Sequence, residues 1–317
     1  MTATSPHLIT ALRSVDIGVP DIAAAEDFYV QTWQLRVAAR QGDAVYLRGT
    51  GADHHLLVLH PSAEPVLRCI TFRAASVDAL DQLAHRAVQL GGSVLRARAT
   101  LAEPGGGEAV VLRDPQGRIL RFVYGDTRHA DTAEQADQPM RLAHVVLNSH
   151  AVAEVQPFYE QALGFKLSDR TRAMAFIRIP QPGLGDHHSI ALADADNDCV
   201  NHIAFVVPKL EAVMRGGGRM RDAGYPIEWG PGRHGPGDNA FNYFVGPAGF
   251  VIEYTAEVEQ VDDSYPTGSP SDWQWPPGRV DQWGVSPPPS ACIKQAQRSI
   301  HFASTESLFL TQETPCN

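Results

Sequence analysis

The chain repeats itself, and this duplication constrains its fold more than any other feature of the sequence. Residues 12–37 and 140–167 each predict a strand, a turn and a helix that carries a Phe-Tyr pair. Asp53-His54-His55 recurs as Asp186-His187-His188, and segment 114–122 recurs as 246–254. The copies lie about 130 residues apart, a self-similarity of the kind that marks repeated structural units.

Each half divides again into two similar units. Residues 8–60 and 67–125 both predict a strand, a helix and further strands, with Ser76 as the N-cap of a helix that ends at Leu90. We expect an α+β protein with one domain over 8–126, a polar linker and a second domain over 139–256. The repeat then stops, and residues 257–317 predict a tail that packs on the second domain or at the mouth of its site.

The helix expected over residues 209–223 contains three consecutive glycines, Gly216 to Gly218. Each glycine costs ~1 kcal/mol relative to alanine in a helix interior. We therefore expect this helix to be either broken or held together by packing.

Composition excludes several classes of function. The net charge is −10 without a basic patch, which argues against nucleic-acid binding. The four cysteines are scattered and contain no C-x-x-C pair, which argues against a disulfide framework and a zinc ribbon. No apolar run approaches the ~20 residues of a membrane span. The start of the chain does not read as a signal peptide, so we expect a cytoplasmic protein.

Residues 232–254 predict a hairpin with an unusual carboxylate. A Gly/Pro-rich loop over Trp229–Gly235 carries His234, and strands are expected over Phe241–Val245 and Phe250–Tyr254. Glu253 stands among apolar neighbours, where a carboxylate needs a basic group, donors or a metal as partner. Asp238 and Asn239 lie in the same loop and could orient His234.

Two histidines stand at matching points of the second half. His144 and His202 each lie in an apolar strand, where a single histidine is more often a core residue. With Glu253 they form a set that could hold a divalent metal and leave coordination positions open. The equivalent positions of the first half carry Asp16, Cys69 and Arg121, which would not hold the same ion.

The pattern His234-x8-Tyr243-x9-Glu253, with Pro and Gly in the intervening turn, resembles the type I extradiol ring-cleavage dioxygenases of the vicinal oxygen chelate superfamily. This family includes catechol 2,3-dioxygenases and biphenyl-2,3-diol dioxygenases. The resemblance implies four βαβββ modules that form two tandem barrel-like domains. It also implies a metal-free N-terminal domain and a catalytic C-terminal domain with Fe(II) on His144, His202 and Glu253; the same ligands accept Mn(II).

The resemblance further implies extradiol cleavage of a small aromatic diol by O2, in aromatic-compound degradation, by a homo-oligomer. His188 would be the acid–base catalyst, and His234 and Tyr243 would hydrogen-bond substrate oxygens. Trp229 and Val146 replace the arginine and asparagine of the homoprotocatechuate-cleaving branch, which favours an apolar or alkyl-, aryl- or hydroxyl-substituted catechol. Two alternatives on the same fold are a metal-dependent enzyme that is not an oxygenase and a binding protein for small aromatics.

Overall fold

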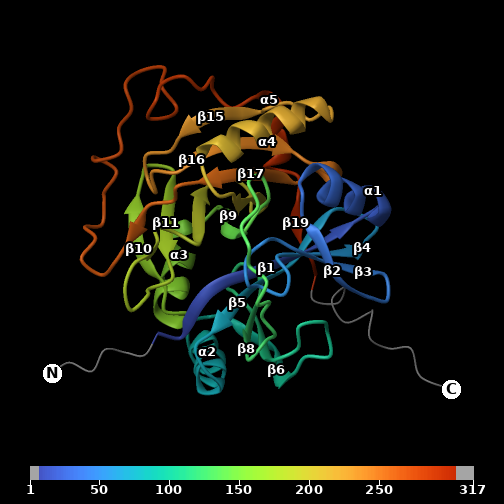
Figure 1. Cartoon of the computed structure of the whole chain (residues 1–317). Helices are drawn as coiled ribbons and strands as arrows, with labels where there is room; N and C mark the ends of the chain where they lie inside the picture. Colours follow the sequence, from blue (N-terminus) through green and yellow to red (C-terminus); the bar gives the residue numbers. More distant parts are fainter. Residues whose placement is uncertain (1–6, 305–317) are drawn as a thin grey trace.

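The two halves of the sequence form two similar sheets, described here from a computed structural model that covers residues 7–304 (Figure 1). The strand order of the first sheet is β2-β3-β4-β1-β5-β8-β7-β6. The order of the second is β10-β11-β13-β9-β14-β17-β16-β15, so each strand has a counterpart at the same place in the other sheet. This is an α+β architecture of two tandem copies, as the sequence repeat predicts.

The first half contains eight strands of the first sheet and two helices. Helix α2 begins after Ser76, whose hydroxyl accepts a hydrogen bond from the Ala79 backbone N–H, as the sequence predicts for an N-cap. The elements are β1 (Ile9–Val19), α1 (Ile22–Asp27), a π-helical turn (Phe28–Thr32), β2 (Arg36–Gln41), β3 (Ala44–Arg48), β4 (Leu57–Pro61), β5 (Val66–Ala74), α2 (Val77–Gln89), β6 (Ser93–Thr100), β7 (Glu108–Arg113) and β8 (Ile119–Tyr124).

The second half repeats this series. Its elements are β9 (Arg141–Ser149), α3 (Val152–Pro157), a π-helical turn (Phe158–Ala162), β10 (Lys166–Arg170), β11 (Met174–Arg178), β12 (Gly185–Asp186), β13 (Ile190–Asp194), β14 (Val200–Val206), α4 (Leu210–Asp222), β15 (Trp229–Arg233), β16 (Ala240–Val245), a 3-10 turn (Pro247–Gly249) and β17 (Val251–Ala256). The predicted Phe-Tyr helices are thus short α-helices that end in a π turn in both halves.

The triple-glycine helix is intact because it packs closely on the sheet. A Cβ on Gly216 would lie 2.7 Å from the Tyr254 ring, and one on Gly217 would lie 2.8 Å from the Asn242 side chain. Glycine therefore lets α4 approach β16 and β17, which offsets its poor helix propensity. Of the two outcomes expected from the sequence, the structure shows a helix held by packing.

The prediction of a loop over Trp229–Gly235 is wrong for its first five residues. Residues 229–233 form β15, which pairs antiparallel with β16. The strand accommodates Pro231 because β15 is the last strand of its sheet and its register shifts between Trp229 and Gly232. An edge strand can spare the backbone N–H that proline lacks.

A single apolar core runs through both halves. Trp33 of the first half stacks on Tyr254 of the second, with ring centroids 3.6 Å apart, and also contacts Phe205 edge-on. The Tyr254 hydroxyl donates to the Trp33 carbonyl oxygen. These contacts fix the two sheets relative to each other.

The segment after the repeat wraps around the second half and returns to the first (Figure 1). It contains β18 (Gln260–Val261), which pairs with β12, α5 (Ala291–Ala296), which packs against β16, and β19 (His301–Phe302), which pairs with β5. None of the helices in residues 7–304 is long and apolar enough to cross a membrane.

Candidate metal centre

The strand register of the second sheet places the predicted metal ligands on one face. Ala204 of β14 lies opposite His144 of β9 and also opposite Glu253 of β17. His202 precedes Ala204 by two residues, so alternation directs it to the same side as Ala204. Tyr243 of β16 in turn lies opposite Glu253.

The three side chains meet at one point. The His144 Nε2 atom lies 3.3 Å from His202 Nε2 and 3.1 Å from Glu253 Oε2, and His202 Nε2 lies 3.3 Å from the same oxygen. All three are buried, and one ligand atom from each lies within 4.8 Å of the others. Two imidazole nitrogens and a carboxylate oxygen approach one another closely, and a shared proton or cation would stabilise this arrangement. The three residues therefore fit a divalent metal.

The electrostatics of the cluster keep its carboxylate ionised. Burial by itself would raise the pKa of Glu253, but His144 and His202 hold that pKa well below its usual range. Burial lowers the pKa of His202, which favours the neutral imidazole that binds metals.

Neighbouring amides orient two of the three ligands. The His202 Nδ1 atom lies 2.8 Å from Asn201 Oδ1, an acceptor, so His202 carries its proton on Nδ1 and leaves Nε2 free for a metal. Asn239 Nδ2 donates to Thr255 Oγ1 at 2.7 Å and to Glu253 Oε1 at 3.4 Å. The His144 Nδ1 atom is buried, and no side chain or backbone group in the described part of the chain hydrogen-bonds to it.

The three predicted catalytic residues lie around this cluster. The His188 ring is stacked obliquely near His144, with centroids 4.3 Å apart, and burial holds the pKa of His188 well below its usual value. His234 Nε2 lies 2.9 Å from the Tyr243 hydroxyl and 3.8 Å from Glu253 Oε1. Burial lowers the pKa of His234 to about 4. Burial, together with the charge of Glu253, raises the pKa of Tyr243.

The expected role of Asp238 and Asn239 is different in the structure. The Asn239 side chain hydrogen-bonds Glu253, and Asp238 Oδ1 accepts a hydrogen bond from Gln282. The His234 ring stacks on Phe241, with centroids 3.9 Å apart, and this contact fixes its plane.

The walls of the site are apolar. Phe176 packs edge-on against His188, and Val146 belongs to a cluster with Ala191 and Ala193. Trp229 stacks on Tyr243, with centroids 4.9 Å apart. The Trp229 Nε1–H group is buried and has no hydrogen-bond partner among residues 7–304.

The tail reaches the loop that carries His234. A Cβ on Gly235 would lie 2.5 Å from the Trp275 ring, and Gln282 Nε2 donates to the His234 carbonyl oxygen. Arg233 lies over the Trp283 ring at 5.2 Å. The tail therefore packs on the second half next to the candidate centre.

The equivalent place in the first half holds an ion pair. Arg121 Nη2 donates to Asp16 Oδ2 at 2.7 Å, and Nη1 donates to Glu103 at 2.6 Å. Burial alone would raise the pKa of Asp16, but the Arg121 guanidinium holds it well below its usual range. A fixed side-chain cation thus stands where the second half gathers metal ligands.

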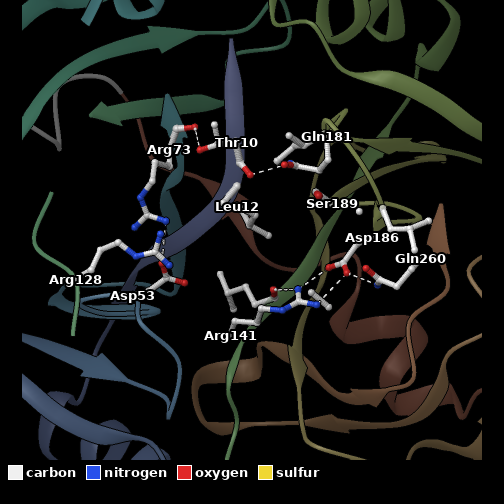
Figure 2. A pocket seen from close by; sticks show the side chains of 16 residues that line it. Thr10, Leu12, Asp53, Arg73, Arg128, Arg141, Gln181, Asp186, Ser189 and Gln260 are labelled. Atoms are coloured by element: carbon white, nitrogen blue, oxygen red, sulfur yellow. Dashed lines mark hydrogen bonds and ion pairs between the residues drawn. The ribbon is translucent and has the colours of Figure 1, made fainter. Parts of the chain in front are cut away.

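A cavity of about 380 Å³ separates the two halves outside the centre (Figure 2). Arg73 and Arg128 lie on one side, and Arg141 lies with Asp186 on the other. The Arg73–Asp53 and Arg141–Asp186 pairs are 2.9 Å apart, so two of the three arginines on these walls are paired with carboxylates. None of the three candidate metal ligands lines this cavity.

Sequence reasoning missed the residues that support the centre. Asn201 directly precedes a candidate ligand, but an amide at a strand position carries no signal of its own. The buried pair Asp169 and His187 was also missed, because Asp169 stands between polar residues in the sequence and reads as exposed.

Comparison with known sequences assigns both halves to one group. A profile described as the Glyoxalase/Bleomycin resistance protein/Dioxygenase superfamily matches residues 141–254, and a glyoxalase-like domain profile matches residues 14–123. Metapyrocatechase 2 of Cupriavidus necator is 32% identical over 192 residues, which are 58% of this chain and 51% of that protein. The chain thus spans about half the length of this relative. A manganese-dependent 2,3-dihydroxybiphenyl 1,2-dioxygenase of Geobacillus genomosp. 3 is 23% identical over 80% of this chain and 87% of its own length.

Solved structures share the whole fold. The Mn(II)-bound glyoxalase from Novosphingobium aromaticivorans superposes with a TM-score of 0.82 at 32% identity, over 88% of this chain and 92% of that one. A homoprotocatechuate 2,3-dioxygenase variant from B. fuscum has a TM-score of 0.78 at 23% identity over 90% and 81% of the two chains, and this likeness concerns the fold alone. Both halves match profiles of one group and a solved relative is about one-third identical along nearly its full length; the chain therefore belongs to the Glyoxalase/Bleomycin resistance protein/Dioxygenase superfamily.

Proposed function

We propose that the protein is a metal-dependent extradiol dioxygenase that cleaves an uncharged catechol-type diol with O2. The observation that carries this proposal is the convergence of His144, His202 and Glu253 within one half, with acid–base and hydrogen-bonding side chains beside them. The relatives named metapyrocatechase and dihydroxybiphenyl dioxygenase support the same reaction class.

The three ligands would hold Fe(II) or Mn(II), and the printed names of two relatives mention manganese. A bound metal would supply Lewis acidity and open positions that orient both the diol and O2. His188 takes a proton from the diol and later returns it, a role suited to an imidazole without a hydrogen-bond partner at Nε2 among residues 7–304. The His234–Tyr243 pair hydrogen-bonds the reacting oxygens and keeps them in place.

The substrate class follows from the walls of the site. Val146 and Phe176 offer no cation for a substrate carboxylate, and Trp229 replaces the arginine expected in the branch that cleaves homoprotocatechuate. An alkyl-, aryl- or hydroxyl-substituted catechol fits this lining. The buried Trp229 N–H could donate to a substituent oxygen, which favours hydroxylated over alkylated rings.

The test is anaerobic reconstitution with Fe(II) or Mn(II), followed by a panel of catechols and air. We expect one O2 consumed per diol and a coloured ring-opened product. Exchange of His188 for Phe should leave metal binding intact and slow turnover by about 10²–10⁴-fold. Full activity of that variant would disprove the role of His188.

A second candidate is a metal-dependent reaction without O2, which the name of the Novosphingobium glyoxalase favours. Metal binding without O2 uptake on any diol would support it. Absence of metal binding would instead favour a binding protein and would refute the proposed centre. We further propose a homo-oligomer, as the family resemblance implies, that is located in the cytoplasm. Light scattering would test the first property and cell fractionation the second.

A further inference from the structure

A buried chain of hydrogen bonds leads from His188 through His187 to Asp169. His188 Nδ1 lies 3.0 Å from His187 Nδ1, and His187 Nε2 lies 2.7 Å from Asp169 Oδ2. The side chains of His187 and Asp169 are 0% exposed. The reaction outlined above makes no use of either residue.

For an ionised carboxylate and two neutral imidazoles, hydrogen-bond chemistry sets the direction of each bond. An ionised carboxylate only accepts, so His187 donates its Nε2–H to Asp169. A neutral imidazole has one donor and one acceptor nitrogen, so His187 Nδ1 then accepts. His188 must therefore donate its Nδ1–H to His187, and its Nε2 is left with a lone pair.

We propose that Asp169 and His187 are positioning residues that hold His188 in the tautomer with an unprotonated Nε2. This is the form in which His188 can accept a proton from the substrate. The catalytic consequence rests on the proposed function, whereas the tautomer itself is a property of the protein without substrate.

The first half contains the same histidine pair with the same bond direction, but there an arginine uses the second ring nitrogen. His54 Nδ1 and His55 Nδ1 are also 3.0 Å apart, but His55 Nε2 lies 2.6 Å from Arg13 Nη1. Arginine only donates, so His55 Nε2 accepts and its Nδ1–H points to His54. Arg13 thus occupies the lone pair that His188 keeps free in the second half.

Residues of the tail hydrogen-bond the Asp169 carboxylate, which sets the bond direction in the second half. Asp169 Oδ1 accepts from the Gly268 backbone N–H at 2.8 Å, and Oδ2 accepts from the Tyr265 hydroxyl at 3.2 Å. A Cβ on Gly268 would lie 2.3 Å from Asp169 Oδ1, so only glycine allows this approach. Residues after the repeat therefore complete the support of His188.

Asp169→Asn should reverse the direction of these hydrogen bonds with little change in side-chain shape. The Gly268 N–H keeps the amide oxygen at the Oδ1 position, so the amide NH2 faces His187 Nε2 and donates to it. His187 then donates from Nδ1, and His188 carries its proton on Nε2. Tyr265→Phe is the matched control, because it removes the tyrosine contact to Asp169 and leaves the donor–acceptor order unchanged.

The direct test is ¹⁵N NMR of histidine tautomers in the full chain loaded with diamagnetic Zn²⁺. His188→Phe identifies the His188 signals among the 13 histidines. We expect Nδ1–H and a bare Nε2 for His188 in the wild type and in Tyr265→Phe, and the reverse in Asp169→Asn. A protonated Nε2 in the wild type, or an unchanged tautomer in Asp169→Asn, would overturn the proposal.

Steady-state kinetics on the Fe(II) or Mn(II) enzyme give the second readout. Asp169→Asn should lower kcat by about 10²–10⁴-fold while KM and metal content stay close to those of the wild type. Tyr265→Phe should retain kcat within about fivefold. If Asp169→Asn fails to fold, the wild-type spectrum still decides. If the NMR shows the expected tautomers but the wild type cleaves no diol, the proposed function is refuted and the positioning role of Asp169 and His187 is not.

Discussion

Replacement of Arg121 by leucine should destabilise the protein by about 3–5 kcal/mol, because it leaves the Asp16 carboxylate buried without its cation. The Arg121 and Asp16 side chains are only 9% and 8% exposed, and within residues 7–304 Asp16 Oδ1 already lacks a hydrogen-bond partner. Glu103 is less affected, since its side chain is 18% exposed and reaches water more readily.

The assay is the free energy of unfolding in urea at neutral pH, with metal content measured in parallel. The double variant Asp16→Leu/Arg121→Leu is the control, because replacing both partners of a buried ion pair by apolar groups is often near neutral. We expect it to recover most of the loss, and both variants to bind metal in the second half as the wild type does. A cost below about 1 kcal/mol for Arg121→Leu would refute the view that this guanidinium stands in for a metal.

Three further outcomes are expected. The depressed pKa of Asp16 stabilises the wild type above pH ~4, and this stability should be lost as the pH falls below that value. Arg121→Leu should not show this loss, because its buried Asp16 carboxyl prefers the protonated form. Parallel curves of unfolding free energy against pH for the two proteins would contradict this. Asn201→Ala should weaken Fe(II) or Mn(II) binding by about 10–100-fold in chelator competition, since His202 loses the acceptor that sets its tautomer; unchanged affinity would contradict this. Gly216→Ala should destabilise the protein by about 1–3 kcal/mol, because its Cβ meets the Tyr254 ring. Gly218 faces open space in the same helix, so Gly218→Ala should stabilise the protein by about 0.5–1 kcal/mol. Thermal or urea unfolding measures both. Equal effects of the two glycine substitutions would show that packing does not set the cost.

The sequence by itself determined the repeat and therefore the fold. A duplicated pattern must build duplicated units, and strand alternation places Glu253 on the face opposite Ile252 and Tyr254. The sequence also singled out His144, His202 and Glu253. The equivalent positions of the first half carry Asp16, Cys69 and Arg121, which are not a metal-binding set. These inferences depend on residue type and local period, which a linear sequence contains in full.

Only the tertiary structure decided how the candidate centre is supported. Whether a histidine donates or accepts depends on what faces its second nitrogen, and for His187 that partner is Asp169, 18 residues away on another strand. Tyr265 and Gly268 reach the same carboxylate from a tail without any repeat pattern. The intact helix over Gly216 likewise depends on a ring from a distant strand. Hydrogen-bond direction and close packing are properties of atoms that meet in space, so no local pattern encodes them.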